Sequence, residues 1–206
     1  MTVIFNTARS KDFTPRLKNS KGKVYKNEEQ FKLLGVDFST HFRNGLSLKT
    51  YIKNCIRRAY TNMWILRRLS EFGVSHEHLF LVYKSRIRVH VEINIPLWTF
   101  SITQEESRKI EKIQRIAALL ILGNQAHKDY YCNLAILETE PLSERRTQMS
   151  LKFAKKALKH PVHKEMFKPV KIKTRSEQRV VVPHCRRKRY EKSAIPSLSK
   201  LLNENS

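Results

Sequence analysis

The chain has 206 residues, with 41 Lys and Arg against 18 Asp and Glu, so its formal net charge at neutral pH is +23. This length suffices for one domain with a real core, alone or followed by a tail. The charge exceeds what solubility requires and predicts an acidic partner. Apolar residues recur through residues 1–160, which excludes disorder of the whole chain.

Several classes of protein are disfavoured. The strongest apolar run, residues 116–122, is too short to cross a bilayer, and no sustained apolar stretch of a signal peptide opens the chain. Nucleic acid is therefore favoured over a membrane as the acidic partner. The three cysteines, Cys55, Cys132 and Cys185, are widely separated, which indicates a reducing compartment. We expect an intracellular protein of the nucleus or cytoplasm, not a secreted one.

Residues 1–40 have the pattern of short β-strands. The segment "TVIF" ends at an Asn-rich break, "SKGKVY" contains a turn at Gly22, and "FKLLGVDF" is an apolar run interrupted by Gly35. We expect this β segment to precede a helical domain over residues 41–166.

Residues 48–69 predict an amphipathic helix, with Ser47 as a candidate cap and Gly73 beyond its end. At about 100° per residue, its apolar positions gather on one side. They are Leu48, Ile52, Cys55, Ile56, Ala59, Met63 and Leu66. The other side interleaves cations with two aromatic rings: Lys49, Lys53, Arg57, Tyr60, Trp64, Arg67 and Arg68.

No carboxylate occurs between Arg43 and Ser70, so this helix lacks the pairs of opposite charge that support an ordinary solvated helix. Two interpretations remain open. The charged side is either simply solvated or made for a polyanion with stackable rings. Tyr60 and Trp64 in turn either pack against neighbouring loops or stack on bases and sugars.

Three further helices are expected from their caps, their terminating residues and their apolar spacing. One begins at Ser75 and is stopped or kinked by Pro96; its inward stripe is Leu79, Tyr83, Ile87 and Val91. The next begins with a capping box of Thr103 and Glu106 and ends at Gly123. Its apolar repeat is Ile110, Ile113, Ala117 and Leu120. A short helix is expected over residues 130–137.

A fifth helix is expected over residues 143–160, with Ser143 as its cap and Met149, Phe153 and Ala157 turned inward. Beyond residue 167 basic residues dominate and little is available to bury. We therefore expect residues 167–206 to form a basic tail that is largely extended or disordered. The predicted fold is mainly α, with about five helices after a small β segment.

Six segments, in this order, resemble one family over nearly the whole chain. They are "FKLLGVDFST" (31–40), "YTNMWILRRLSEFGVS" (60–75), "LVYKSRIRVHVEINIPLW" (81–98), "SITQEESRKIEKIQRIAALLILG" (101–123), "YYCNLAILETEPLSERRTQMSLKFAKKALKHP" (130–161) and the tail at 173–203. The chain resembles the C-terminal part of a reverse transcriptase from a non-LTR (LINE-type, jockey-like) retrotransposon.

This resemblance implies that residues 1–40 finish the polymerase palm and that residues 41–166 form the thumb and post-polymerase region. The helix at 48–69 would then grip the template-primer duplex. The cluster Arg186, Arg187, Lys188 and Arg189 has two interpretations, a nuclear import signal or phosphate contacts.

The resemblance does not extend to the catalytic residues. A polymerase needs paired aspartates to bridge two divalent ions, whereas Asp12, Asp37 and Asp129 stand apart. The family's pair would lie upstream of Met1. We expect no catalytic residue, no resident cofactor (Mg²⁺ would belong to the missing palm site) and no enzyme activity of this chain alone. A zinc knuckle is not expected either, because its cysteines are missing around the available donors. These donors are His160, His163, His184 and Cys185.

The leading hypothesis is a fragment of an RNA-directed DNA polymerase that binds RNA and DNA without sequence preference. The alternatives are a degenerate remnant acting, if at all, as a helical protein-interaction module, and one part of a working enzyme that needs an upstream polymerase segment as its partner.

Overall fold

The computed structural model describes residues 22, 30–41, 45–170 and 180–205. The chain divides into two compact units, residues 1–54 and 55–206. The boundary lies inside the first helix, 14 residues later than the β segment was expected to end. The fold is mainly helical with a small sheet, as the sequence predicted.

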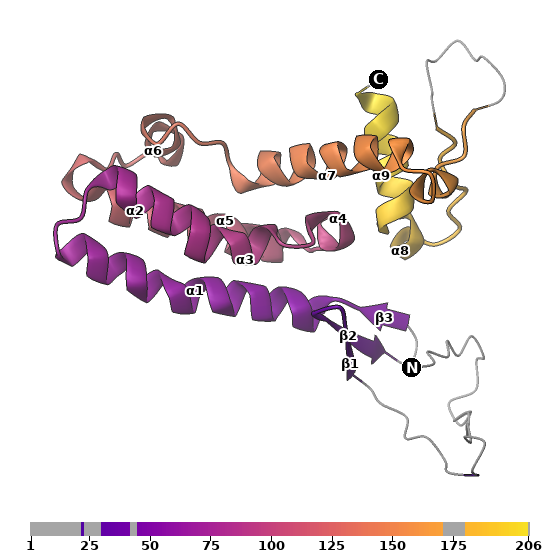
Figure 1. The fold of residues 1–206 in the computed structure, drawn as a ribbon, viewed down its shortest axis with the longest axis horizontal. Coiled ribbons are helices and arrows are strands. Elements are labelled where there is room, and N and C mark those ends of the chain that lie inside the picture. Colours follow the sequence, from indigo (N-terminus) through magenta and orange to yellow (C-terminus); the bar gives the residue numbers. More distant parts are fainter. Residues whose placement is uncertain (1–21, 23–29, 42–44, 171–179, 206) are drawn as a thin grey trace. The chain divides into compact units, whose positions relative to one another are not determined.

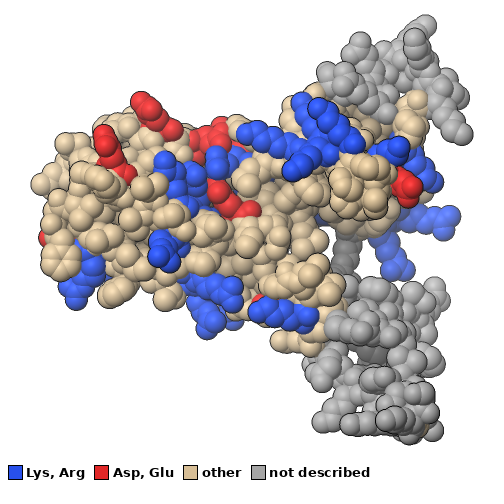
Figure 2. Space-filling view, in the orientation of Figure 1, with Lys and Arg blue, Asp and Glu red and all other residues tan. Residues whose placement is uncertain are grey.

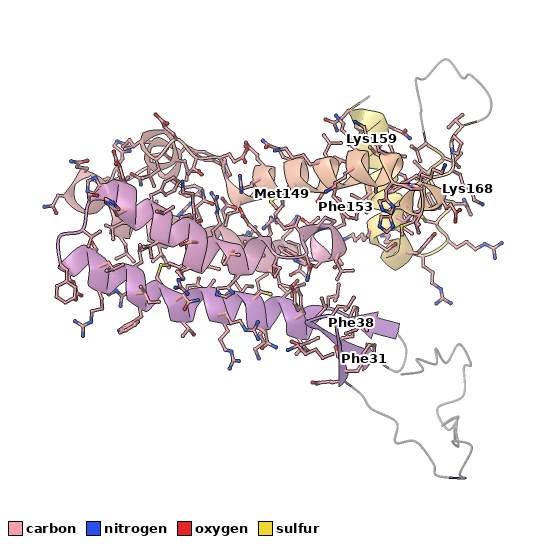
Figure 3. The ribbon with its side chains drawn as sticks, viewed as in Figure 1. Phe31, Phe38, Met149, Phe153, Lys159 and Lys168 are labelled. Atoms are coloured by element: carbon pink, nitrogen blue, oxygen red, sulfur yellow. The ribbon has the colours of Figure 1, made fainter. Side chains whose placement is uncertain are left out.

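The sheet of the first unit contains β1 (Gln30–Leu33), β2 (Val36–His41) and β3 (Gly45–Ser47), paired antiparallel in that order. Leu34 and Gly35 both have positive φ, as a two-residue hairpin turn requires. Phe31 pairs with Phe38 across the strands, and their rings stack 5.3 Å apart (Figure 3). The predicted segments at 2–5 and 20–25 lie outside the described residues, apart from Gly22.

Helix α1 (Lys49–Glu71) crosses the boundary between the units. At its start, the Lys49 backbone N donates to Ser47 Oγ at 3.3 Å. At its end, Gly73 has a φ of 73° and its backbone N donates to the Ser70 carbonyl, so the predicted glycine terminates the helix.

The second unit continues with a helical stretch composed of α2 (His76–Val82), η1 (Tyr83–Arg88) and α3 (Val89–Glu92), followed by α4 (Ile95–Trp98) (Figure 1). The middle piece is a π-helix. The predicted inward stripe is confirmed, because its four members are at most 2% exposed: Leu79, Tyr83, Ile87 and Val91.

Helix α5 (Gln104–Leu122) begins with the predicted capping box: the Glu106 backbone N donates to Thr103 Oγ1, and the Thr103 backbone N donates to the Glu106 carboxylate. Three predicted core residues are buried and Leu120 is half-buried. The chain then passes through η2 (Gly123–Gln125) and α6 (Tyr130–Ile136).

Helix α7 (Leu142–Lys159) begins differently from the prediction. Ser143 is not its cap but lies inside the first turn. The cap comes from α5, where the Glu111 carboxylate accepts from the backbone N of Leu142 at 3.1 Å and of Ser143 at 3.2 Å. The Tyr130 hydroxyl donates to the same carboxylate at 2.5 Å.

The inward face of α7 also differs. Phe153 was expected inside but is 46% exposed, and Met149 is only partly buried; Ala157 is buried as predicted. Small or polar residues occupy the buried stripe instead, since α7 packs against α4, α5 and α9. This stripe is Leu142, Arg146, Ser150, Ala154 and Ala157.

The expected disordered tail is contradicted over its last part. After η3 (His163–Met166), a bridge joins Pro169 to Val180, and the chain forms α8 (Lys188–Glu191) and α9 (Ala194–Glu204). Figure 1 shows α9 crossing the C-terminal half of α7. Helix α9 buries an apolar face that the basic composition around it concealed. The resulting core cluster is Ala154, Ala157, Phe167, Val180, Leu198 and Leu202.

Candidate nucleic-acid interface

The basic and aromatic side of α1 faces outward in the second unit. We call this surface, formed by Arg57, Tyr60, Trp64, Arg67 and Arg68, the α1 face. All five side chains are exposed, with Trp64 at 64% and Tyr60 at 36%. The predicted separation of the helix into two sides is therefore confirmed for these residues.

The opposite side of α1 fixes how the helix is rotated. Ala59 and Leu66 are completely buried and Met63 is 4% exposed. Two polar side chains add directional contacts. Asn62 Nδ2 donates to the Arg86 carbonyl at 3.0 Å, and Ser70 Oγ donates to the Leu120 carbonyl at 3.0 Å. The α1 face is therefore presented to solvent by a packed helix.

The first turns of α1 belong to the other unit. Lys49 and Lys53 are exposed there, as predicted. Asn54 Nδ2 donates to the Asp37 carboxylate at 3.1 Å, which ties this end of the helix to β2.

An acidic residue, which was not among the residues predicted for this surface, lies at one end of the α1 face. Glu71, one residue beyond the carboxylate-free interval, forms an ion pair with Arg68 at 3.0 Å between Nη1 and Oε2. Both side chains are more than half exposed. Such a surface pair contributes at most about 1 kcal/mol, so exchanging Glu71 for another anion would cost this guanidinium little.

A cation from another helix was also missed. Burial raises the pKa of the Tyr60 hydroxyl, and the positive charge of Lys109 on α5 partly offsets this shift. Lys109 itself is exposed and forms an ion pair with Glu105 at 2.6 Å. Its position beside the α1 face depends on how α5 packs, which no spacing within α1 could reveal.

The basic cluster near the C-terminus is not part of the α1 face. Arg186, Arg187 and Lys188 are exposed around the start of α8, which packs on α9. Arg189 lies on α8, and its side chain is outside the described residues. The two groups of cations considered as candidates for binding phosphate therefore lie on different elements, α1 and the start of α8.

Several of the remaining candidates have structural partners. Asp129 caps α6 by accepting from the Cys132 backbone N at 3.0 Å, which lowers the pKa of this carboxyl. His160 and His163 stack at 4.4 Å between ring centroids. Within the described part of the chain, no three His, Cys, Asp or Glu residues come close enough together to hold a metal ion.

Comparison of the chain with protein-family models, curated proteins and solved structures found no match. Among the helices of the described residues, none combines the length and apolar character needed to span a membrane.

Proposed function

We propose that this chain is the C-terminal, nucleic-acid-binding part of a non-LTR retrotransposon reverse transcriptase, with α1 as the thumb helix that contacts template and primer. One observation carries the proposal. A well-anchored helix exposes Arg57, Arg67 and Trp64 together, although exposing them does nothing for its own packing.

The chemistry of the α1 face fits a single strand or a strand end. Guanidinium groups bind phosphates, and the exposed indole of Trp64 offers a surface on which any base can stack. Binding by such a surface tolerates sequence, because backbone phosphates and base faces are common to all nucleotides. Each phosphate neutralised adds roughly 0.7 to 0.9 to the slope of log affinity against log salt.

The test is a titration of a labelled single-stranded RNA and a primer-template duplex at several salt concentrations. Arg57→Gln/Arg67→Gln should weaken binding to the single strand and reduce its salt slope by roughly 1.4. Arg115→Gln/Lys128→Gln removes the same charge from exposed positions on and beyond α5 and serves as the control. Equal losses in the two variants, or a flat salt response of the parent chain, would contradict the proposal.

Trp64 gives a second readout in the same titration. The chain has two tryptophans, and Trp98 is 2% exposed, so quenching by bases should affect mainly Trp64. Trp64→Ala should abolish the quenching and weaken single-strand binding by about 1–3 kcal/mol.

A second candidate, a helical protein-interaction module, is favoured by one observation. Leu81, Val89 and Ile93 on the stretch from α2 to the end of α3 are all more than 40% exposed, although they are large and apolar. Here the occupant would be a second copy of the chain. Self-association that depends on concentration, is lost in Leu81→Ser/Ile93→Ser and occurs without affinity for RNA would favour this candidate.

A further inference from the structure

The outer side of α7 carries a row of lysines. Lys152, Lys155, Lys156 and Lys159 are all exposed, and we call them the α7 lysine row. Their separations of three, four and seven residues place them on one side of the helix, over about 10 Å of its length. The nearest acids in sequence, Glu144 and Glu165, lie outside the row.

The row has opposing effects within the helix: Lys156 and Lys159 in the last turn interact favourably with the negative end of the helix dipole, whereas like charges along one side repel. The pairs Lys152–Lys156 and Lys155–Lys159 set like charges four residues apart, which costs a few tenths of a kcal/mol each. Some other exposed cations of this unit do have acidic partners, for example Lys109 with Glu105 and Lys200 with Glu191. None of the six ion pairs formed among the described residues involves the α7 lysine row.

Packing does not explain the lysines either. Helix α7 is anchored from its other side by residues such as Ser150, Ala154 and Ala157, which are at most 3% exposed. The lysine stems are therefore not needed to cover apolar surface. The helix dipole accounts for Lys156 and Lys159 in the last turn but not for Lys152 and Lys155, so a partner that supplies negative charge is the reason we favour for keeping all four ammonium groups together.

The positive surface continues past the end of α7. Lys164 and Lys168 are also exposed, and Figure 3 shows Lys159 at the end of α7 and Lys168 beyond it. Figure 2 shows Lys and Arg side chains gathered over the second half of α7 and the segments that follow.

The α7 lysine row differs in chemistry from the α1 face. Its four members include no arginine and no aromatic residue; the half-exposed Phe153 lies at the edge of the row, about 100° around the helix from Lys152 and about 60° from Lys156. Lysines act as mobile point charges that attract phosphates but do not stack on bases. A surface of this kind suits a duplex, whose phosphates face outward while its bases are paired inside.

We propose that the α7 lysine row binds the phosphate backbone of a nucleic-acid duplex, at a surface separate from the α1 face. The inference rests on the proposed function, because it takes nucleic acid as the chain's partner. It adds a second surface and a division of roles: the α1 face binds the unpaired nucleotides of template or primer, and α7 binds the duplex that the two strands form.

The experiment compares three variants of the full chain with three probes: a mixed-sequence DNA duplex, a single-stranded oligonucleotide of one base, and vesicles of anionic phospholipid. Changing all four lysines of the row to Gln should reduce the salt slope for duplex binding by roughly 3 to 4, at about 0.9 per phosphate. Single-strand binding should change much less. The four corresponding Lys→Arg changes should retain duplex affinity, and both variants should keep the helical circular dichroism of the parent chain.

The variant Arg57→Gln/Arg67→Gln separates the two proposals. Loss of single-strand affinity in that variant, together with unchanged duplex affinity in the Lys→Gln variant, would overturn the α7 inference and leave the proposed function standing. A parent chain that binds neither probe would overturn both. If the Lys→Gln variant loses binding only to vesicles of anionic phospholipid, α7 binds a membrane surface and the inference is wrong.

Discussion

Glu111 joins three elements through a single carboxylate. It accepts from the backbone N of Leu142 and Ser143 at the start of α7, and from the hydroxyl of Tyr130 on α6. Acceptors are needed at this place because Pro141, the residue before α7, has no side-chain group that could accept from the first turn. The negative charge also interacts favourably with the positive end of the helix dipole.

Glu111→Ala should therefore lower the free energy of unfolding by about 2–3 kcal/mol, since it leaves three donors without this acceptor. Chemical denaturation measures the change. Glu144→Gln is the control, because Glu144 is exposed in the first turn of the same helix. A loss for Glu111→Ala no larger than that for Glu144→Gln would show that the carboxylate does not hold α7.

His90 should make stability depend on pH. Burial lowers the pKa of its imidazole, and the charge of Arg58 lowers it further. In the neutral ring Nε2 can accept from Asn62 Nδ2, which is 2.7 Å away. Below about pH 6.5 the imidazole is protonated in the unfolded chain, whereas its lowered pKa keeps it neutral in the folded chain. The contribution of the neutral His90 ring to the free energy of unfolding is thus present above about pH 6.5 and is lost as the pH falls through the lowered pKa.

Measured unfolding free energies should show this difference between the parent chain and His90→Gln. The parent chain should lose more stability than the variant between about pH 7 and about pH 5, because glutamine does not titrate. Comparing the two chains cancels the contribution of the other seven histidines. Identical pH dependence would exclude His90 as the source.

At the scale of elements, sequence patterns within one helix predicted its structure, whereas the packing between helices could not be predicted from the sequence. The capping box of α5 and the two sides of α1 follow from sequence spacing alone. The buried stripe of α7 does not. Alanines and Ser150 face the core there because neighbouring helices approach closely, so the large Phe153 remains outside. Only the tertiary packing decides that choice.

Helix α9 was missed for a related reason. Its sequence "AIPSLSKLLNE" is amphipathic, but it follows a strongly basic stretch whose composition is typical of disorder. Asn203 also supports the chain locally: its Nδ2 donates to the Val180 carbonyl at 2.9 Å, and its Oδ1 accepts from the Val180 backbone N. No pattern in the sequence pairs these two residues.

Leu202→Ala should consequently destabilise the second unit by about 2–4 kcal/mol, as expected for a cavity in a packed core. Leu202 is 5% exposed and belongs to the cluster shared by α7 and α9. Leu119→Ala provides the control, since Leu119 is 45% exposed. Should the two variants unfold at the same denaturant concentration, α9 would not be part of the cooperative core.

For the whole molecule, the net charge of +23 has opposite effects on folding and on binding. In the free chain, cations repel one another, and the α7 lysine row adds like charges within one helix. Salt screens this repulsion over a Debye length of about 10 Å at 0.1 M. Salt should therefore stabilise the free protein. It should weaken the proposed complex, because high salt opposes the release of counterions from the nucleic acid.

Thermal unfolding of the same sample, with and without a duplex oligonucleotide, tests both effects. Raising the salt from about 0.02 M to about 0.5 M should increase the melting temperature of the free chain, because screening weakens attractions and repulsions alike and the repulsions dominate at a net charge of +23. With the duplex present at about 100 times its dissociation constant, low salt should instead give the higher stability, by about 2.7 kcal/mol over the free chain. The stability gained from the duplex should disappear at about 0.5 M salt. A melting temperature that falls with salt in the free chain would mean that its ion pairs outweigh its repulsions, and the positive charge would then need no polyanion to account for it.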